Sequence, residues 1–338
     1  MKSSKKPPLS VRIPKVLKRY KDEALRGVYG RSGRWARLAR FPIPMLEPWR
    51  APEIHLRRPQ GLGDVLLCTP AIRELKRRNP QCRVYFYTDY PAFVRGLPYI
   101  DEVRPTSLAP SNSLFMDYKD AIPVHAHIAR VIGDRLGLGV SDVTPDCMVD
   151  SKLVQKWKEA WSSLPRPHIL ILRRASSWTP NKDWQEASWV ELINEIAHFG
   201  TVIESGATVE QTPVPHGSYV DLRGSTSLEE LIAAVAAADL YIGPISGAMH
   251  IAAAVKTPAI VIAGGYEHPC GVAYTGQTYM YTTGSCSPCW LRGPCPSDKM
   301  CLAAISPAAV KQLVQERWAD GAKTSSEAAP EILELAMA

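Results

Sequence analysis

A glycine-rich turn followed by an acidic residue is the first segment that can carry chemistry. Gly61, Leu62, Gly63 and Asp64 stand between a predicted strand and a predicted helix. The two glycines let the backbone turn tightly and let a substrate approach it, and the start of a helix offers unpaired N–H groups to an anion. A carboxylate at this place can act as a general base, so Asp64 is predicted to be catalytic. The alternative is that Asp64 only caps the helix.

A second turn opens an alanine-rich helix near residue 247. Small residues there leave space above the helix N-terminus, where N–H groups and the helix dipole favour a phosphate. The alternative is a tight turn without a ligand, in which His250 makes only a structural hydrogen bond. The predicted donor-binding residues of this turn are Ser246, Gly247, Ala248, Met249 and His250.

Cations follow the first predicted strand of the second half of the chain. Lys182 lies in the loop after that strand, and Arg173 and Arg174 lie at the strand end. A positive charge at this edge of a sheet can neutralise a diphosphate leaving group. We therefore expect Lys182 and Arg173 to bind the donor phosphates, although most loop lysines are simply solvated.

Four of the eight cysteines gather within sixteen residues, as Cys286-x2-Cys289-x5-Cys295-x5-Cys301. A two-residue gap lets one turn present two thiolates to a metal ion, and a reducing compartment disfavours disulfides. The spacing predicts a knuckle with structural zinc or iron. Reduced free thiols are the alternative, and a metal that shapes an oligomer interface is a third interpretation. Four thiolates leave no open position, so no catalytic metal is expected.

The hydrophobic pattern predicts how these segments are positioned. Strands at 53–58, 83–88 and 100–104 surround the helix that follows the first turn, which is a βαβ order. In the second half, strands and helices alternate from residue 168 to residue 265, with one helix ending at Gly200 and another capped by Ser227. The βαβ order predicts a parallel sheet in the first half, and the alternation predicts a doubly wound α/β domain in the second half. A last helix is expected at 307–318.

Length, composition and charge bound the organisation of the chain. A chain of 338 residues with 46% hydrophobic residues can form two cores. Residues 1–50 hold 14 lysines and arginines against three acidic residues, whereas the rest holds 26 against 30. We divide the chain into a basic amphipathic extension (1–50), an N-terminal domain (51–155), a C-terminal domain that includes the cysteines (156–320), and a loose tail (321–338).

The basic extension predicts an anionic partner. Residues 11–41 read as amphipathic helices with basic residues beside an apolar, aromatic face, which suits a membrane surface. Nucleic acid is the alternative partner. No apolar run reaches the length of a membrane span, and the basic start of the sequence lacks the apolar region of a signal peptide. We therefore expect a cytoplasmic protein that associates peripherally with the inner leaflet of the plasma membrane.

Taken in order, these segments resemble glycosyltransferase family 9, the heptosyltransferase-like enzymes. The resemblance covers about residues 54–318, and it rests on four stretches together with the cysteine-bearing end. These stretches are GLGDVLLCTPAIRELKRRNP, SWVELINEIA, LRGSTSLEELIAAVAAADLYIG and SGAMHIAAAVKTPAIVIAGG.

The resemblance implies an α/β chain with a GT-B fold, in which two Rossmann-like, doubly wound domains face each other across the cleft that holds the active site. The acceptor would bind mainly to the N-terminal half, beside Gly61 and Gly63, and the nucleotide-sugar, often ADP-heptose, to the C-terminal half. Transfer would invert the anomeric centre without a divalent metal. By position, Asp64 matches the family's base and Lys182 its phosphate-binding lysine, and Ser246 to His250 match the turn that contacts the diphosphate and sugar.

The expected activity is thus transfer of a heptose-like sugar or a hexose from a nucleoside diphosphate sugar, ADP-linked favoured, to a saccharide, lipid-linked or protein acceptor. A homo-oligomer is a further expectation. One position departs from the family, because Ile245 stands where an aspartate usually contacts the donor. Two alternatives stay open. One is a binding module that grips nucleic acid or membrane, and the other is a nucleotide-sugar epimerase.

Overall fold

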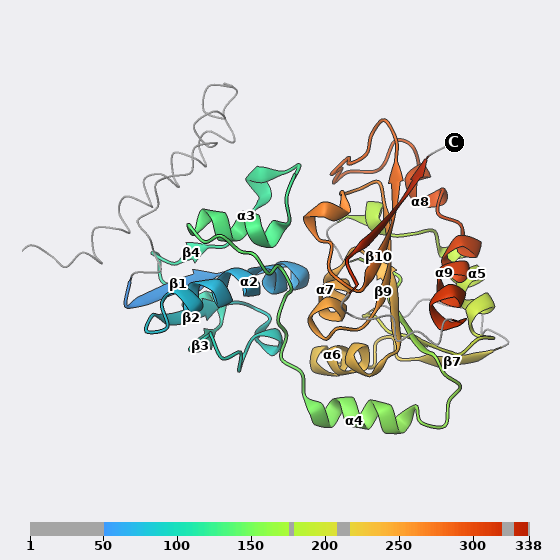
Figure 1. Ribbon diagram of the computed structural model, residues 1–338, viewed down its shortest axis with the longest axis horizontal. Coiled ribbons are helices and arrows are strands. Elements are labelled where there is room, and N and C mark those ends of the chain that lie inside the picture. The colour runs from blue at the N-terminus through green and yellow to red at the C-terminus, as the bar shows by residue number, and fades with distance from the viewer. Residues whose placement is uncertain (1–50, 176–178, 208–216, 320–327, 337–338) are drawn as a thin grey trace, which may run out of the picture.

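The computed structural model describes residues 51–338, apart from 176–178, 208–216, 320–327 and 337–338. Two α/β halves stand side by side and are joined by the segment around α4 (Figure 1). The predicted extension, residues 1–50, lies outside the described residues. No described helix is both long and apolar enough to cross a bilayer.

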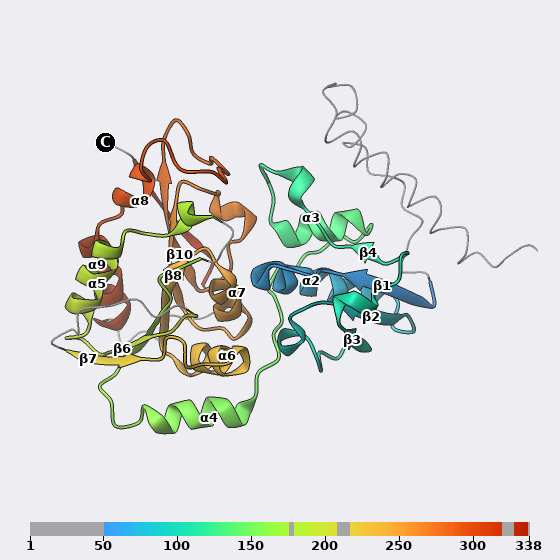
Figure 2. The same ribbon diagram turned by 180° about the vertical axis from the view of Figure 1, so that it is seen from behind.

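The N-terminal half is built on a four-stranded parallel sheet with the order β3-β2-β1-β4. Helix α2 follows β1 directly and runs along the sheet, and α3 follows β4 (Figure 2). The predicted βαβ order is therefore confirmed, and the short β4 is an addition that the sequence did not indicate. The elements are β1 (Glu53–Arg57), α2 (Leu62–Arg78), β2 (Arg83–Tyr87), β3 (Glu102–Arg104), β4 (Leu114–Phe115) and α3 (Ile128–Arg135).

The C-terminal half is built on a seven-stranded parallel sheet with the order β11-β10-β9-β8-β5-β6-β7. The chain starts at the central strand β5, builds outward through β6 and β7, and then returns to β8 on the other side of β5. Ligands of such sheets bind where the order reverses, at the carboxyl ends of the strands. The strands are β5 (His168–Ile171), β6 (Thr201–Glu204), β7 (Ser218–Asp221), β8 (Leu240–Pro244), β9 (Ala259–Gly264), β10 (Gln277–Thr283) and β11 (Glu331–Ala336).

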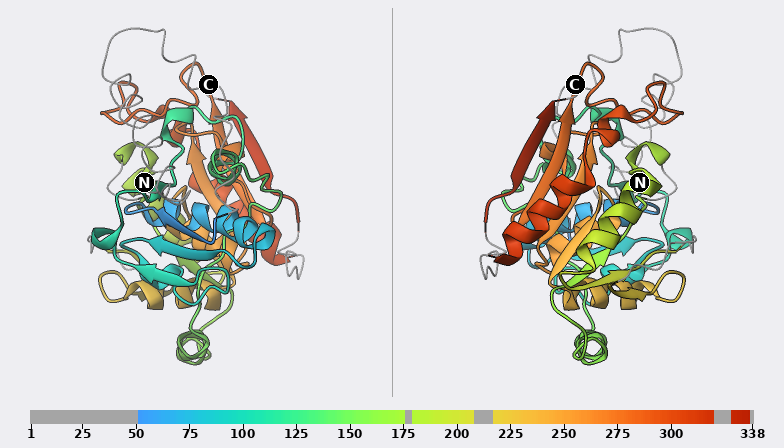
Figure 3. Two further views of the ribbon diagram at one scale, coloured as in Figure 1. Left: turned by 90° about the vertical axis from the view of Figure 1, so that its left-hand side faces the viewer. Right: turned by 90° about the vertical axis from the view of Figure 1, so that its right-hand side faces the viewer.

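Helices cover both faces of this sheet, which confirms the doubly wound prediction (Figure 3). Buried side chains of α5, α8 and α9 form one core with one face of the strands. Side chains of α6 and α7 belong to a second core that continues into α2 and β1 of the N-terminal half. The helices are α4 (Ser151–Ala160), α5 (Glu186–Ile196), α6 (Leu228–Ala237), α7 (Gly247–Ala254), α8 (Met300–Ala303) and α9 (Pro307–Ala319).

The predicted start of α6 agrees with the structure, whereas the predicted end of α5 does not. Ser227 caps α6 in a reciprocal capping box with Glu230, as predicted. The prediction that the preceding helix ends at Gly200 was wrong, because α5 ends at Ile196 with Ala197 as its C-cap residue. Gly200 instead lies against Pro167, so close that a side chain would collide with the Pro167 backbone.

The predicted loose tail contains a strand, which corrects the interpretation of residues 321–338. Residues 331–336 form β11 and pair in parallel with β10, from Thr278 opposite Glu331 to Thr283 opposite Ala336. The segment therefore extends the C-terminal sheet at its edge.

Candidate active site

The start of α2 meets the start of α7 at the boundary between the two halves. A Cβ atom placed on Gly63 would lie 2.6 Å from Cδ2 and 3.0 Å from Nε2 of His250. A Cβ atom on Gly247 would likewise collide with the side chain of Leu62. Glycine is required at both positions because the backbone of one half touches a side chain of the other. The two turns predicted from the sequence are thus brought together.

Asp64 lies in the first turn of α2 and is held at both carboxylate oxygens. Its Oδ2 accepts a hydrogen bond from Arg58 Nη2, and its Oδ1 accepts one from the Tyr118 hydroxyl at 2.9 Å. The residue at the N-cap position of α2 is Gly61, and no side chain caps this helix. The alternative interpretation of Asp64 as an N-cap is therefore wrong. The Asp64 side chain remains 21% exposed.

Arg58 is the buried ion-pair partner of the Asp64 carboxylate. Its side chain is only 2% exposed, and it also donates to the Asp117 carboxylate and to the Met116 carbonyl, both at 2.9 Å. Burial alone would lower the arginine pKa, but the charge of Asp64 and its hydrogen bond outweigh burial and raise it. Arg58 is thus a permanent cation beneath Asp64. No sequence motif marks this residue.

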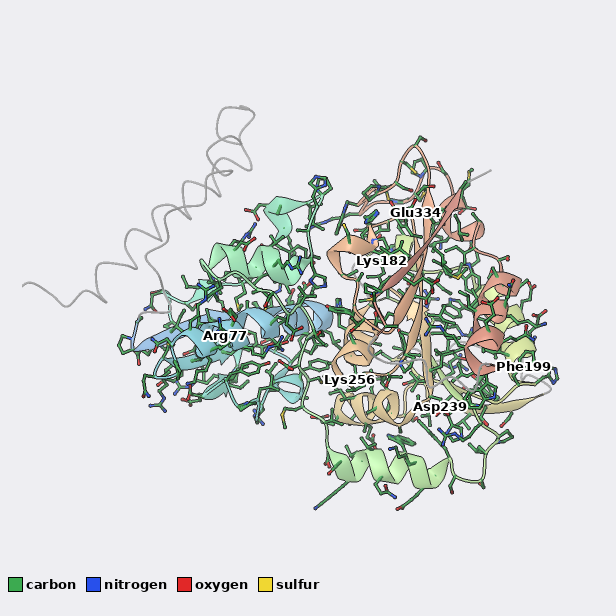
Figure 4. The ribbon with its side chains drawn as sticks, in the orientation of Figure 1. Arg77, Lys182, Phe199, Asp239, Lys256 and Glu334 are labelled. Atoms are coloured by element: carbon green, nitrogen blue, oxygen red, sulfur yellow. The ribbon has the colours of Figure 1, made fainter. Side chains whose placement is uncertain are left out.

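Lys182 follows β5 and pairs with a second residue that the sequence did not mark. Its Nζ forms an ion pair with Oε1 of Glu267 and lies 5.1 Å from the centre of the Tyr266 ring. Glu267 belongs to the loop after β9, so the pair joins the ends of two strands. Lys182 lies on the side of the C-terminal half nearer to the N-terminal half, whereas Phe199 lies far from it (Figure 4).

His250 is buried in the first turns of α7 and is uncharged. Its Nδ1 is 2.7 Å from the Tyr274 hydroxyl. Its pKa is lowered to about 3, mainly by burial and to a smaller extent by the nearby His127 and Lys182. Tyr274 is itself buried with a raised pKa, so its hydroxyl keeps its proton. The Cδ2 and Nε2 atoms of His250 face Gly63.

Groups from both halves act on one another across this boundary. Burial is the first cause that raises the pKa of Tyr118, and the negative charges of Asp64 and Glu267 raise it further. Tyr118 and Asp64 belong to the N-terminal half, and Glu267 belongs to the C-terminal half. The predicted base and the predicted phosphate-binding lysine therefore share one electrostatic environment.

Two other predicted donor residues lie in different surroundings. Arg173 is buried and forms ion pairs with Glu186 and Glu204, the latter at 2.6 Å. Ser246 is the N-cap residue of α7, but its side chain makes no capping hydrogen bond, and its hydroxyl lies 3.3 Å from that of Tyr241. Ile245 is 4% exposed and packs in the core. At this position, next to the α7 turn, the chain offers an apolar side chain.

The four predicted metal ligands lie in the loop after β10 and at the start of α8. The pKa of the Cys301 thiol is raised. Burial is the largest cause, and the nearby Cys289 and Cys286 contribute to the increase. Within the described part of the chain, however, no three His, Cys, Asp or Glu side chains form a group that would hold a metal ion. The expected knuckle is thus present as a loop, without an assembled set of ligands.

Part of the chain is similar to a known protein family. Residues 118–282 match glycosyltransferase family 9 (heptosyltransferase). The lipopolysaccharide heptosyltransferase 1 of Salmonella typhimurium is 25% identical over 165 residues. That match covers 47% of this chain and 51% of the relative, so the chain matches about half the length of this relative.

Solved structures share the fold. A glycosyltransferase family 9 structure from Veillonella parvula is 17% identical, with a TM-score of 0.61 and coverage of 79% of this chain and 97% of that chain. TibC from enterotoxigenic E. coli, described as a dodecameric iron-containing heptosyltransferase in complex with ADP-D-β-D-heptose, is 19% identical. Its TM-score is 0.61, and the match covers 80% of this chain and 76% of TibC. At these identities the likeness establishes the architecture alone.

Proposed function

We propose that the chain is an inverting glycosyltransferase that moves a sugar from a nucleoside diphosphate sugar to a saccharide or protein acceptor, because residues 118–282 match glycosyltransferase family 9. The observation that carries this proposal is the contact of the two turns, in which the α2 start bearing Asp64 meets the α7 start bearing His250. The turn that bears the Asp64 carboxylate in one half and the N-terminal end of α7 in the other half are thereby juxtaposed.

Asp64 takes the proton of the acceptor hydroxyl in this proposal. Each carboxylate oxygen accepts one hydrogen bond in the structure, from Arg58 or from Tyr118, and each can accept another. The partly exposed carboxylate therefore has a lone pair for an incoming hydroxyl while its orientation stays fixed. As that proton leaves, the acceptor oxygen attacks the anomeric carbon from the side opposite to the diphosphate.

The leaving nucleoside diphosphate departs toward the C-terminal half. Lys182 offers a positive charge, and the first N–H groups of α7 offer hydrogen bonds where negative charge develops. The neutral His250 adds an uncharged N–H donor at Nε2, beside Gly63. Such fixed donors need little reorganisation during the reaction, which is why they stabilise a transition state well.

The donor that we favour is an ADP-linked heptose. The relative from Salmonella is a heptosyltransferase, and TibC is described in complex with ADP-D-β-D-heptose. The acceptor is a saccharide, lipid-linked or protein hydroxyl. Residues 1–50 add to this proposal a basic arm that attracts the enzyme to the anionic inner leaflet, where a lipid-linked acceptor lies.

The first experiment is a thermal-stability screen with ADP, UDP, GDP, CMP and their sugar conjugates. Stabilisation by one nucleoside diphosphate, followed by transfer of its sugar to an acceptor, would support the proposal. Asp64→Asn should then lose transfer while it keeps the stabilisation by nucleotide. Absence of stabilisation by every nucleotide would favour a binding module, because Ile245 offers no hydrogen bond to a donor. Conversion of the donor without any acceptor would favour an epimerase.

A structural zinc or iron ion at the four cysteines is a second part of the proposal. The spacing of Cys286 and Cys289 and the iron described for TibC support it, whereas the described cysteines form no assembled ligand set. Elemental analysis of the purified protein tests it. About one zinc or iron per chain, lost in Cys286→Ser with Cys289→Ser, is expected, and metal-free protein would exclude it.

A further inference from the structure

The structure assigns to Glu267 a role that no sequence motif indicates: we propose that it is the positioning residue of Lys182, holding the ammonium group in place for the diphosphate of the donor. The inference rests on the proposed function and deepens it. Glu267 follows β9 and Lys182 follows β5. The pair therefore lies beyond the carboxyl ends of these strands, where the strand order reverses between β5 and β8. Ligands of doubly wound sheets bind at this edge.

The depth of the two side chains indicates which of them faces a ligand. The Glu267 side chain is 5% exposed, and that of Lys182 is 16% exposed. The carboxylate therefore lies beneath the ammonium group, and a ligand reaches the lysine first. An ammonium group has three N–H donors. In the proposal, Nζ keeps its ion pair with Glu267 Oε1 while its N–H donors bind phosphate oxygens.

Tyr266 restricts the lysine from a second side. The ammonium nitrogen lies 5.1 Å from the centre of the Tyr266 ring, within the range of a cation–π contact. A flexible lysine side chain loses rotamer entropy when it is fixed in one geometry. Because the residues at 266 and 267 already hold it, less of that entropy remains to be lost when the phosphate binds.

The same arrangement occurs on the other side of the boundary with the charges reversed. Asp64 is 21% exposed and lies above Arg58, which is 2% exposed. In both pairs the residue with the proposed chemical role is the shallower one, and the deeper partner has the opposite charge. Each partner is more buried than the residue it holds, as expected of a group that orients rather than contacts the substrate.

Glu267 also interacts electrostatically with a residue of the N-terminal half. Its negative charge acts on Tyr118, which donates to Asp64, and the charge of Lys182 acts on His250. The pair therefore lies among the residues proposed to bind and react. A rival role is that Glu267 occupies the place of the phosphate and repels it, and this rival predicts the opposite effect on affinity.

The test is the affinity for ADP and for adenosine, measured by calorimetry on full-length wild type, Glu267→Gln and Glu267→Asp. We expect Glu267→Gln to weaken ADP binding about tenfold and to leave adenosine unchanged, because adenosine has no phosphate for Lys182 to contact. Glu267→Asp should restore part of the loss. In a cycle with Lys182→Met, the two substitutions should be strongly non-additive.

Controls separate positioning from folding and from the proposed function itself. Glu195→Gln removes another lysine–glutamate pair of this half, Lys311–Glu195 at 3.0 Å, and should leave ADP affinity unchanged. Weaker binding of both ADP and adenosine in Glu267→Gln would indicate structural damage and overturn the inference. Unchanged or tighter ADP binding would overturn it as well, while the proposed function would stand. A wild-type protein that binds no nucleotide would overturn both.

Discussion

The Tyr118 hydroxyl donates a hydrogen bond of 2.9 Å to Oδ1 of Asp64, which lies 54 residues earlier in the chain. The burial of Tyr118 and the charge of Asp64 raise the pKa of the phenol, so it stays a donor throughout the neutral range. Arg58 fixes the other carboxylate oxygen. Two donors of different kinds thus determine the direction in which Asp64 presents its free lone pairs.

Tyr118→Phe tests the value of this hydrogen bond. The substitution removes one hydroxyl and keeps the ring that lies against Arg58. A hydrogen bond to a charged group contributes about 1.5–3 kcal/mol, so we expect kcat to fall about 10- to 100-fold with little change in the affinity for the nucleotide. Steady-state kinetics with the donor identified in the nucleotide screen measures it. Unchanged kcat would mean that Arg58 alone orients Asp64.

Much of this fold is readable from the sequence, because strands and helices alternate with clear periods. The central strands of the C-terminal half are apolar runs, and Ser227 with Glu230 marks a helix start. Strand β11 was missed since EILELA lies beyond a polar stretch, and its partner β10 is about fifty residues away in the chain. The segment forms a strand because it pairs with β10, and its local sequence pattern alone does not indicate this.

The candidate site was readable only in part, for a related reason. Asp64, Lys182 and His250 stand in turns that local pattern identifies. Their partners Arg58, Tyr118 and Glu267 stand in ordinary strand ends and loops, and only the assembled halves bring them into contact. The end of a buried strand at Arg58 was the one available indication, since an arginine there has to find a counter-charge.

Gly63→Ala tests the contact between the two halves. The added methyl group would lie 2.6 Å from Cδ2 of the buried His250, closer than any stable contact, so one half must shift. We expect a loss of about 1–3 kcal/mol in the free energy of unfolding and a larger relative loss of transfer activity. Chemical denaturation and kinetics measure the two effects.

Gly139→Ala is the matched control for that substitution. A Cβ atom there would meet only the end of the Arg78 side chain, at 3.7 Å, which is an ordinary contact. We expect stability and activity close to those of the wild type. Equal behaviour of the two alanine variants would show that the close approach of Gly63 to His250 is not required.

Buried histidines at the boundary make stability depend on pH below neutrality. Burial is the main cause that lowers the pKa of both His250 and His127 to about 3, whereas an unfolded histidine titrates near 6.5. Between these values the unfolded chain binds more protons than the folded chain, so the free energy of unfolding rises with pH. The contribution is complete above about pH 6.5 and is lost progressively as the pH falls toward 3.

Urea unfolding at pH 7 and at pH 5 measures this dependence. Each of the two histidines should make the protein about 2 kcal/mol less stable at pH 5 than at pH 7. His250→Gln should be less stable than the wild type at pH 7, because it loses the hydrogen bond with Tyr274, but it should lose less on acidification. The exposed His125 provides the control, since His125→Gln should keep the wild-type dependence. If His250→Gln lost as much stability on acidification as the wild type, then His250 would not be a buried neutral donor facing Gly63, and its place in the mechanism would have to be abandoned.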